Sequence, residues 1–253
     1  MNWERLSRRI ASCMGAGWTP EPASVLEAVN AHREYWRPPE VRVLLLAESH
    51  VMTTAAEAMA TVSLAPFGLA DTPSSFVRLV YCLGYGESSL VKPEVVKNAG
   101  TPQFWKLLAA CVGVLDGGPF KKTTEPDSQR RVQGKIELLH ELQRRGVWLL
   151  DASPVALYAG GGTKPAAKDL REALRVSWEE YSCERVKEVS PRAVVVIGKT
   201  VFDVLGDKLR SAVPRATVDW VYQPQARVSA ERHRAGLETL ESVVREAGTR
   251  GRT

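Results

Sequence analysis

The segment VRVLLLAESH at residues 41–50 decides the fold, because a short apolar run is followed at once by polar residues. A run such as 41–47, rich in Val and Leu, is typical of a strand that is buried on both faces of a parallel sheet. Three later runs have the same character, and they span 147–151, 192–198 and 216–222. We therefore expect four strands in one parallel sheet.

Helix-like patterns surround these runs. They cover 3–14, 22–35, 74–84, 102–114, 128–145, 168–188, 199–209 and 229–247. Alternating strands and helices imply right-handed crossovers, which place helices on both faces of a parallel sheet. The sequence thus predicts a single α/β domain over 1–253, a three-layer αβα sandwich with a central four-stranded parallel sheet. Residues 1–40 form a helical preface to it, and 248–253 a flexible tail.

The composition is that of an ordinary globular protein. Of its 253 residues 44% are hydrophobic and 25% charged, and the net charge of +5 is compatible with nucleic acid. No apolar run approaches the roughly 18 residues of a membrane span, and the charged N-terminus does not resemble a signal peptide. The four cysteines form no C-x-x-C pair. We expect a cytoplasmic monomer without metal or cofactor.

The residues after the four strands form the candidate site, because ligands of such sheets bind beyond the carboxyl ends of the strands. In chain order these residues are Glu48, Ser49 and His50; Asp151, Ala152 and Ser153; Gly198, Lys199 and Thr200; and Gln223, Pro224, Gln225 and Arg227. Lys199, Thr200 and Arg227 suit phosphates, since a helix begins after Gly198. Three consecutive glycines at 160–162 suggest flexibility or a close backbone approach.

These segments, in this order, resemble the uracil-DNA glycosylase superfamily. The first strand is followed by Ala47-Glu48-Ser49-His50, where the family has Gly-Glu-Ala-Pro-Gly or Gly-Gln-Asp-Pro-Tyr. Pro66-Phe67-Gly68 is similar to the family's Pro-Phe-x-Gly segment. Asp151 stands where the second strand of the family ends in Asn, and Pro191 with AVVVIGKTVFDVL is similar to the third motif. Tyr222-Gln223-Pro224-Gln225 replaces His-Pro-Ser or Asn-Pro-Ser.

The resemblance implies a DNA glycosylase, a hydrolase that cuts the N-glycosidic bond of a flipped base in DNA. Glu48 would orient the attacking water, and Ser49 is the catalytic-motif position at which the most active uracil enzymes of the family carry Asp. The Gln223 amide would donate to the departing base. Four residues would then line the base site, with the Phe67 ring stacked on the base. They are His50, Phe67, Asp151 and Gln225.

Asp151 points to an unusual base. An Asn amide satisfies both O4 and N3–H of uracil, whereas an ionised carboxylate only accepts hydrogen bonds. Asp151 therefore suits an exocyclic amine such as N4 of cytosine. The expected substrate is a damaged or modified base, such as a modified cytosine or a hypermodified phage base, rather than plain uracil. Such an enzyme would serve in DNA repair or in anti-phage defence.

Each of these residues also has a purely structural explanation. Glu48 can cap a helix or pair with a cation, and Asp151 can form an Asx turn. Phe67 can be an ordinary core aromatic, and Lys199 with Thr200 can face solvent. A non-catalytic DNA- or nucleotide-binding module of glycosylase-like fold is therefore the alternative to the enzyme. A different hydrolase on a doubly wound sheet is a third possibility.

Overall fold

The computed structural model describes residues 1–15, 18–116, 118–158 and 165–249, which fold into two compact units. The first unit comprises Met1–Tyr35, Glu48–Gly100 and Asp151–Glu184, and the second comprises Trp36–Ala47, Thr101–Leu150 and Arg185–Thr253. The glycines at 160–162, and residues 250–253 of the expected tail, lie outside the described residues.

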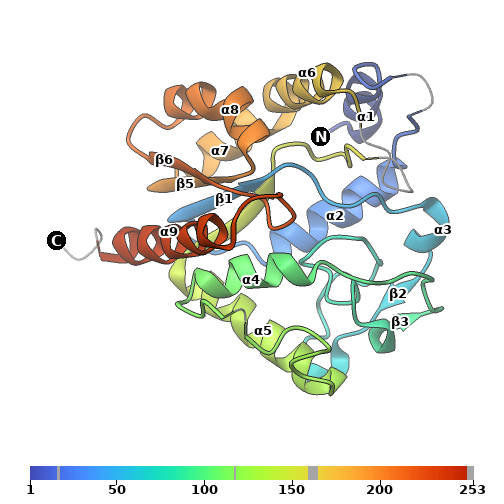
Figure 1. The fold of residues 1–253 in the computed structure, drawn as a ribbon. Coiled ribbons are helices and arrows are strands. Elements are labelled where there is room, and N and C mark those ends of the chain that lie inside the picture. The colour runs from blue at the N-terminus through green and yellow to red at the C-terminus, as the bar shows by residue number, and fades with distance from the viewer. Residues whose placement is uncertain (16–17, 117, 159–164, 250–253) are drawn as a thin grey trace. The chain divides into compact units, whose positions relative to one another are not determined.

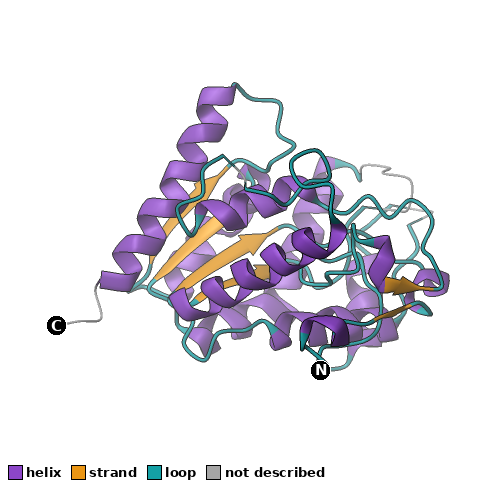
Figure 2. Cartoon of the chain, turned by 90° about the horizontal axis from the view of Figure 1, so that it is seen from below, coloured by secondary structure: helices purple, strands orange, loops and turns teal. Residues whose placement is uncertain are grey.

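A four-stranded parallel sheet is the centre of the second unit, as predicted, and its strand order is β4-β1-β5-β6 (Figures 1 and 2). The strands are β1 (Val43–Ala47), β4 (Val147–Asp151), β5 (Ala193–Ile197) and β6 (Thr217–Val221). The first three are buried along their whole length, whereas β6 is an edge strand with exposed residues. Continuous burial explains why β1, β4 and β5 read as unbroken apolar runs.

Helices cover both faces of this sheet, which confirms the three-layer αβα sandwich. Helix α8 (Lys199–Ala212) packs on β5 and β6 from one side. Helix α9 (Ala230–Thr249) packs on the other side, with α4 (Pro102–Ala110) against α9 and α5 (Ser128–Arg145) against α4 (Figure 1). Helix α7 (Cys183–Val189) leads into β5.

Helix α5 has the bounds that its capping residues predict. The Asp127 carboxylate accepts hydrogen bonds from the N–H groups of Gln129 and Arg130 at the first turn. The helix ends at Gly146, which has a φ of 70°. A Cβ at Gly146 would lie 2.7 Å from the Glu40 carbonyl oxygen, so glycine serves both the left-handed turn and the close approach.

The first unit is mostly helical. Helix α1 (Trp3–Ala11) packs against α2 (Ala23–Tyr35) and α6 (Ala167–Ser177). A π-helical turn, η3 (Trp178–Ser182), joins α6 to α7, so the helix predicted over 168–188 is real but composite. The shorter elements are α3 (Ala55–Ala58), β2 (Thr61–Val62), η1 (Ala65–Phe67), η2 (Ser88–Leu90) and β3 (Val91–Lys92), of which β2 and β3 form an antiparallel pair (Figure 1).

The helix predicted over 74–84 is wrong. The backbone there is extended and then turns, because it bonds to distant segments instead of to itself. Ser74 accepts from the Val62 N–H over 2.6 Å, and the Phe76 N–H donates to Ala60 over 3.0 Å. Further along, the Arg78 N–H donates to the Thr53 hydroxyl over 2.8 Å. Tertiary partners therefore replace the hydrogen bonds of a helix whose apolar spacing looked favourable.

Among the described residues, no helix is both long and apolar enough to cross a membrane.

Candidate functional site

The strand order marks one edge of the sheet as a place for a ligand. The chain passes from β1 to β4 on one side and then to β5 on the other side of β1. The direction of winding therefore reverses between β1 and β5. In open α/β sheets, ligands bind outside the carboxyl ends of the strands at such a reversal. Glu48 follows β1 directly, and Gly198 follows β5.

Two of the predicted residues, His50 and Asp151, belong to a buried cluster of charges in the first unit. The His50 Nε2 atom donates to Glu21 over 2.8 Å, and the Nδ1 atom lies 3.7 Å from the Asp151 carboxylate. Asp151 also forms an ion pair with Arg33, whose side chain is 1% exposed. The His50 and Glu21 side chains have no solvent exposure at all.

The pKa directions favour the ionised form of all four groups of this cluster. Burial by itself would lower the pKa of His50, but the Glu21 carboxylate and the Asp151 hydrogen bond raise it to about 9. Burial would raise the pKa of both carboxyls. The His50 cation instead lowers the pKa of Glu21, and the Arg33 guanidinium lowers the pKa of Asp151. Two cations thus balance two carboxylates, as the burial of charge requires.

This cluster fixes the segment after β1 against the segment after β4. The Glu21 carboxylate accepts from the Thr53 N–H over 2.7 Å and from the Ala156 N–H over 3.1 Å. The Ser153 N–H donates to the Glu48 carbonyl over 2.9 Å. Glu48 and the backbone that follows it are therefore joined to the segment after β4 by hydrogen bonds, two of which end on the buried Glu21 carboxylate.

Glu48 itself is buried, with 6% exposure, and its carboxylate is hydrogen-bonded to the hydroxyl of Tyr158. Burial and this carboxylate together raise the pKa of Tyr158 above its ordinary value. The phenol therefore stays protonated and remains a donor to Glu48. A carboxylate positioned in this way, away from bulk water, can orient a single water molecule or stabilise a nearby positive charge.

Ser49 and Phe67 lie in the same unit in different surroundings. The Ser49 hydroxyl accepts from the Leu157 N–H over 3.2 Å, which ties it to the segment after β4. Phe67 ends the short helix η1, and Gly68 follows with a φ of 76°. The Phe67 side chain is half-exposed, so its ring is not part of the buried core. Its stacking on a base stays a prediction.

Gln223 lies in the second unit against Gly198. A Cβ at Gly198 would come within 3.0 Å of the Gln223 Cγ atom, and Gly198 has a φ of 116°. The Gly198 N–H donates to the Val221 carbonyl over 2.8 Å, which holds the ends of β5 and β6 together. Glycine after β5 therefore makes room for the glutamine after β6.

The predicted phosphate-binding residues are near the surface of the second unit. Lys199 pairs with Asp203 at 2.7 Å, and its ammonium lies 5.9 Å from the centre of the Trp220 ring. Thr200 is half-buried, whereas Gln225 and Arg227 are exposed. Glu48, Ser49, His50, Phe67 and Asp151 thus belong to the first unit, and Gln223, Gln225, Lys199, Thr200 and Arg227 to the second. Their cooperation in one active site stays a prediction.

Sequence reasoning missed Glu21, Arg33 and Tyr158. A signal for Arg33 exists, because the buried residues of α2 are Val25, Leu26, Val29, His32 and Arg33. This is the spacing of an apolar helix face, in which the last two positions carry polar side chains. A buried charged residue is almost always paired with a group of opposite charge. A buried Arg33 therefore indicates that an acidic side chain lies next to it in the fold.

No metal centre is visible in the described part of the chain, where no group of three or more His, Cys, Asp or Glu side chains is placed to hold an ion. Comparisons with known proteins give no family assignment: no protein-family model matches this chain, and no curated protein matches it.

Proposed function

We propose that this protein is a DNA glycosylase that hydrolyses the N-glycosidic bond of a damaged or modified base. The observation that carries the proposal is the buried Glu48, which directly follows β1 at the reversal of strand winding and whose carboxylate is held by Tyr158. The Glu48 position is also the first motif of the resemblance to the uracil-DNA glycosylase superfamily.

The proposed chemistry needs negative charge near a positive sugar carbon. Glycosidic cleavage passes through an oxocarbenium-like sugar, which a nearby carboxylate stabilises while water attacks. Glu48 would supply that charge and orient the water. The Gln223 amide would donate to the departing base, and stacking on Phe67 would offset the few kcal/mol that base flipping costs. The reaction consumes one water and yields a free base and an abasic site.

We propose the base in broader terms than the cytosine-type base predicted from the sequence. That narrower prediction depends on Asp151, whose carboxylate is paired with the buried Arg33. Because the ion pair explains an acid at this position without any ligand, the substrate class is a damaged or modified base, with modified cytosines and hypermodified phage bases included. DNA repair and anti-phage defence are both compatible with such an activity.

A panel of oligonucleotides tests this proposal. Each would carry one candidate base, in single- and double-stranded form, with plain uracil included. We expect mass spectrometry to detect a free base and an abasic site from at least one substrate. Glu48→Gln should reduce the rate by roughly a hundredfold or more, the effect of losing a key electrostatic group. The proposal fails if no substrate releases a base, or if Glu48→Gln is as active as the wild type.

Glu94→Gln is the matched control, because Glu94 is an exposed glutamate of the same unit. It should retain wild-type activity, and DNA binding by Glu48→Gln should also persist. The second candidate function is a non-catalytic DNA- or nucleotide-binding module, which Gln223 favours because it stands where the resembling family carries His or Asn. Binding of DNA by the wild type without release of any base would select that function.

A further inference from the structure

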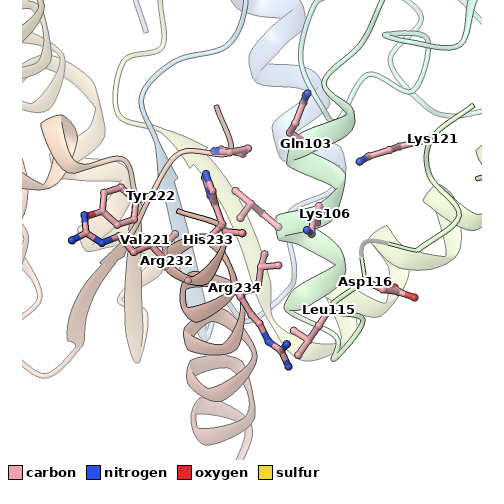
Figure 3. Close-up of a pocket in the computed structure, with 15 residues that line it drawn as sticks. Gln103, Lys106, Leu115, Asp116, Lys121, Val221, Tyr222, Arg232, His233 and Arg234 are labelled. Carbon is pink, nitrogen blue, oxygen red and sulfur yellow. The ribbon is translucent and has the colours of Figure 1, made fainter. Parts of the chain in front are cut away.

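The second unit contains a cavity that no residue of the proposed chemistry lines. Its volume is about 580 Å³, and it lies between α4, α9 and the segment after β6 (Figure 3). Its lining comprises Gln103, Lys106, Leu107, Leu115, Asp116, Lys121, Val221, Tyr222, Pro224, Ala230, Arg232, His233, Arg234, Gly236 and Leu237. This volume is within the range of roughly 300–1,000 Å³ that is usual for small-molecule sites.

The charges of the lining strongly favour an anion. Lys106, Lys121, Arg232 and Arg234 face a single acid, Asp116. Arg234 is paired with Glu238 at 2.9 Å, and the Asp116 carboxylate already accepts from the Gly118 N–H over 3.0 Å. Of the other three cations, Figure 3 shows Lys106 and Lys121 on the side of α4 and Arg232 beside Tyr222, so the two lysines are left for one ligand group.

Two of these cations, Lys106 and Lys121, are half-buried. Within the described ranges, neither ammonium has an acidic side chain within ion-pair distance. Figure 3 shows Lys121 extending from its loop toward α4, from which Lys106 and Gln103 also project. Partial burial weakens the hydration of an ammonium, so two unpaired lysines in the lining of one cavity favour a bound anion.

The backbone reinforces this preference. Both α4 and α9 begin at the cavity, since Gln103 is in the first turn of α4 and Ala230 is the first residue of α9. Helix N-termini attract negative charge. His233, at the start of α9, donates from Nε2 to the Ala226 carbonyl over 3.0 Å, which holds its ring in the wall of the cavity.

The rest of the lining is apolar and aromatic. Leu107, Val221, Pro224 and Leu237 contribute apolar surface, and Tyr222 contributes a ring. An inorganic anion would use none of this surface. A ligand that joins a phosphate to a flat heterocycle would use both parts, because heterocycles stack on aromatic rings while phosphates bind lysine and arginine.

We propose that this cavity binds a nucleotide, with its phosphate on Lys106 and Lys121 and its base against the apolar wall and Tyr222. The inference goes beyond the glycosylase proposal, because it requires neither Glu48 nor any bond cleavage. A nucleotide unit can be a free mononucleotide or part of a DNA strand. Both sources offer the same chemistry, and the experiment separates them.

Calorimetric titration of the full chain tests the proposal with four probes: deoxycytidine monophosphate, deoxycytidine, inorganic phosphate and a short single-stranded oligonucleotide. We expect the monophosphate to bind at least tenfold more tightly than both the nucleoside and phosphate. Stronger binding of the oligonucleotide than of the monophosphate would identify a strand as the source, and the reverse order a free nucleotide. Binding of phosphate as tight as that of the monophosphate would overturn the proposal.

The matched variants are Lys121→Gln and Lys122→Gln, since Lys122 is the exposed neighbour that does not line the cavity. Loss of one charge-assisted contact should weaken nucleotide binding roughly tenfold or more in Lys121→Gln and in Lys106→Gln. Lys122→Gln should bind as the wild type does. Equal affinities in all three variants, with circular dichroism showing that each is folded, would contradict the proposal.

Glu48→Gln separates this inference from the proposed function. It should bind the monophosphate with unchanged affinity, whether or not the wild type releases a base. A protein that releases bases but does not bind the monophosphate or the oligonucleotide through Lys106 and Lys121 would be a glycosylase without this site. Binding of the monophosphate through Lys106 and Lys121, without release of any base, would support this site and contradict the glycosylase proposal.

Discussion

The imidazole of His50 donates to the carboxylate of Glu21 over 2.8 Å, and neither side chain has any exposure to solvent. Glu21 lies just before α2, whereas His50 lies just after the end of β1. The ion pair therefore fastens the segment that carries Glu48 to the N-terminal part of the first unit. Its strength depends on the protonation of His50, so the stability of this segment depends on pH.

The stabilisation by His50 should disappear in mildly alkaline solution. Because folding raises the pKa of His50 from an ordinary 6.5 to about 9, its contribution is complete below pH 6.5 and is lost as the pH rises through about 9. The shift corresponds to a free energy of unfolding on the order of 3 kcal/mol. Urea unfolding of the wild type and His50→Gln should show the largest difference at about pH 6 and a much smaller one at about pH 10.

The difference between the two proteins is the quantity that matters, since groups that do not interact with His50 titrate equally in both. His140 is an exposed histidine of α5, and His140→Gln serves as the control. It should follow the wild type across the whole range. A constant difference between wild type and His50→Gln from acid to alkaline pH would show that His50 is not a cation in the folded protein.

Asp151→Asn should destabilise the protein strongly, by about 3–5 kcal/mol, because it leaves the buried Arg33 without its counter-ion. The double variant Arg33→Leu, Asp151→Asn should recover part of this loss, since it removes the uncompensated charge as well. Chemical unfolding of the two single variants and the double variant measures the coupling. Additive losses would mean that the two side chains do not stabilise each other.

The regular elements of the sheet could be predicted because their signals are local. Unbroken apolar runs over 43–47, 147–150 and 193–197 follow from burial on both faces. Helix α5 could be predicted over 128–145 because its apolar spacing is local, and the structure shows Asp127 and Gly146 as its caps. The segment 74–84 could not, because its conformation depends on hydrogen bonds to residues that are distant in the sequence.

The candidate site, too, could be predicted only where its signals are local. Glu48 and Asp151 could be predicted as site residues, because they stand at the carboxyl ends of predicted strands. Their partners Tyr158 and Arg33 lie far away in sequence, and only the fold brings them together. The ion pair also gives Asp151 a structural explanation that the strand pattern could not separate from a role in base recognition.

Gly198→Ala should destabilise the protein by about 1–3 kcal/mol, because a φ of 116° strains any residue with a Cβ. The added methyl would also meet the Gln223 side chain at 3.0–3.2 Å. Thermal unfolding of Gly198→Ala in a Gln223→Ala background separates the backbone strain from the contact. The truncated side chain at position 223 relieves the contact, whereas the strain of the positive φ remains. Gly206→Ala, inside α8 and without positive φ, is the control and should be neutral or stabilising.

Tyr158→Phe should slow base release while leaving the fold intact. The variant keeps the ring but removes the hydroxyl that donates to Glu48, a bond to a charged group worth about 1.5–3 kcal/mol. On an active substrate we expect kcat to fall roughly tenfold or more with little change in KM, because Tyr158 positions Glu48 without binding the base. A rise in KM at constant kcat would instead place Tyr158 in substrate binding.

Glu48→Gln should lower the pKa of Tyr158, which tests the contact between the two residues without any substrate. The pKa of this phenol is raised first by burial and then by the Glu48 carboxylate, which disfavours a second negative charge beside it. An amide at position 48 removes the charge but leaves the burial. The phenol should therefore ionise at lower pH than in the wild type and still above the ordinary 10.0.

Nuclear magnetic resonance of ring-labelled tyrosines follows each phenol separately, and Tyr158→Phe assigns the signal by its disappearance. Glu94→Gln should leave the titration unchanged, because Glu94 is an exposed acid and not among the groups that shift Tyr158. An identical Tyr158 titration in wild type and Glu48→Gln would show that the phenol does not donate to Glu48, and the geometry proposed for the catalytic carboxylate would then be wrong.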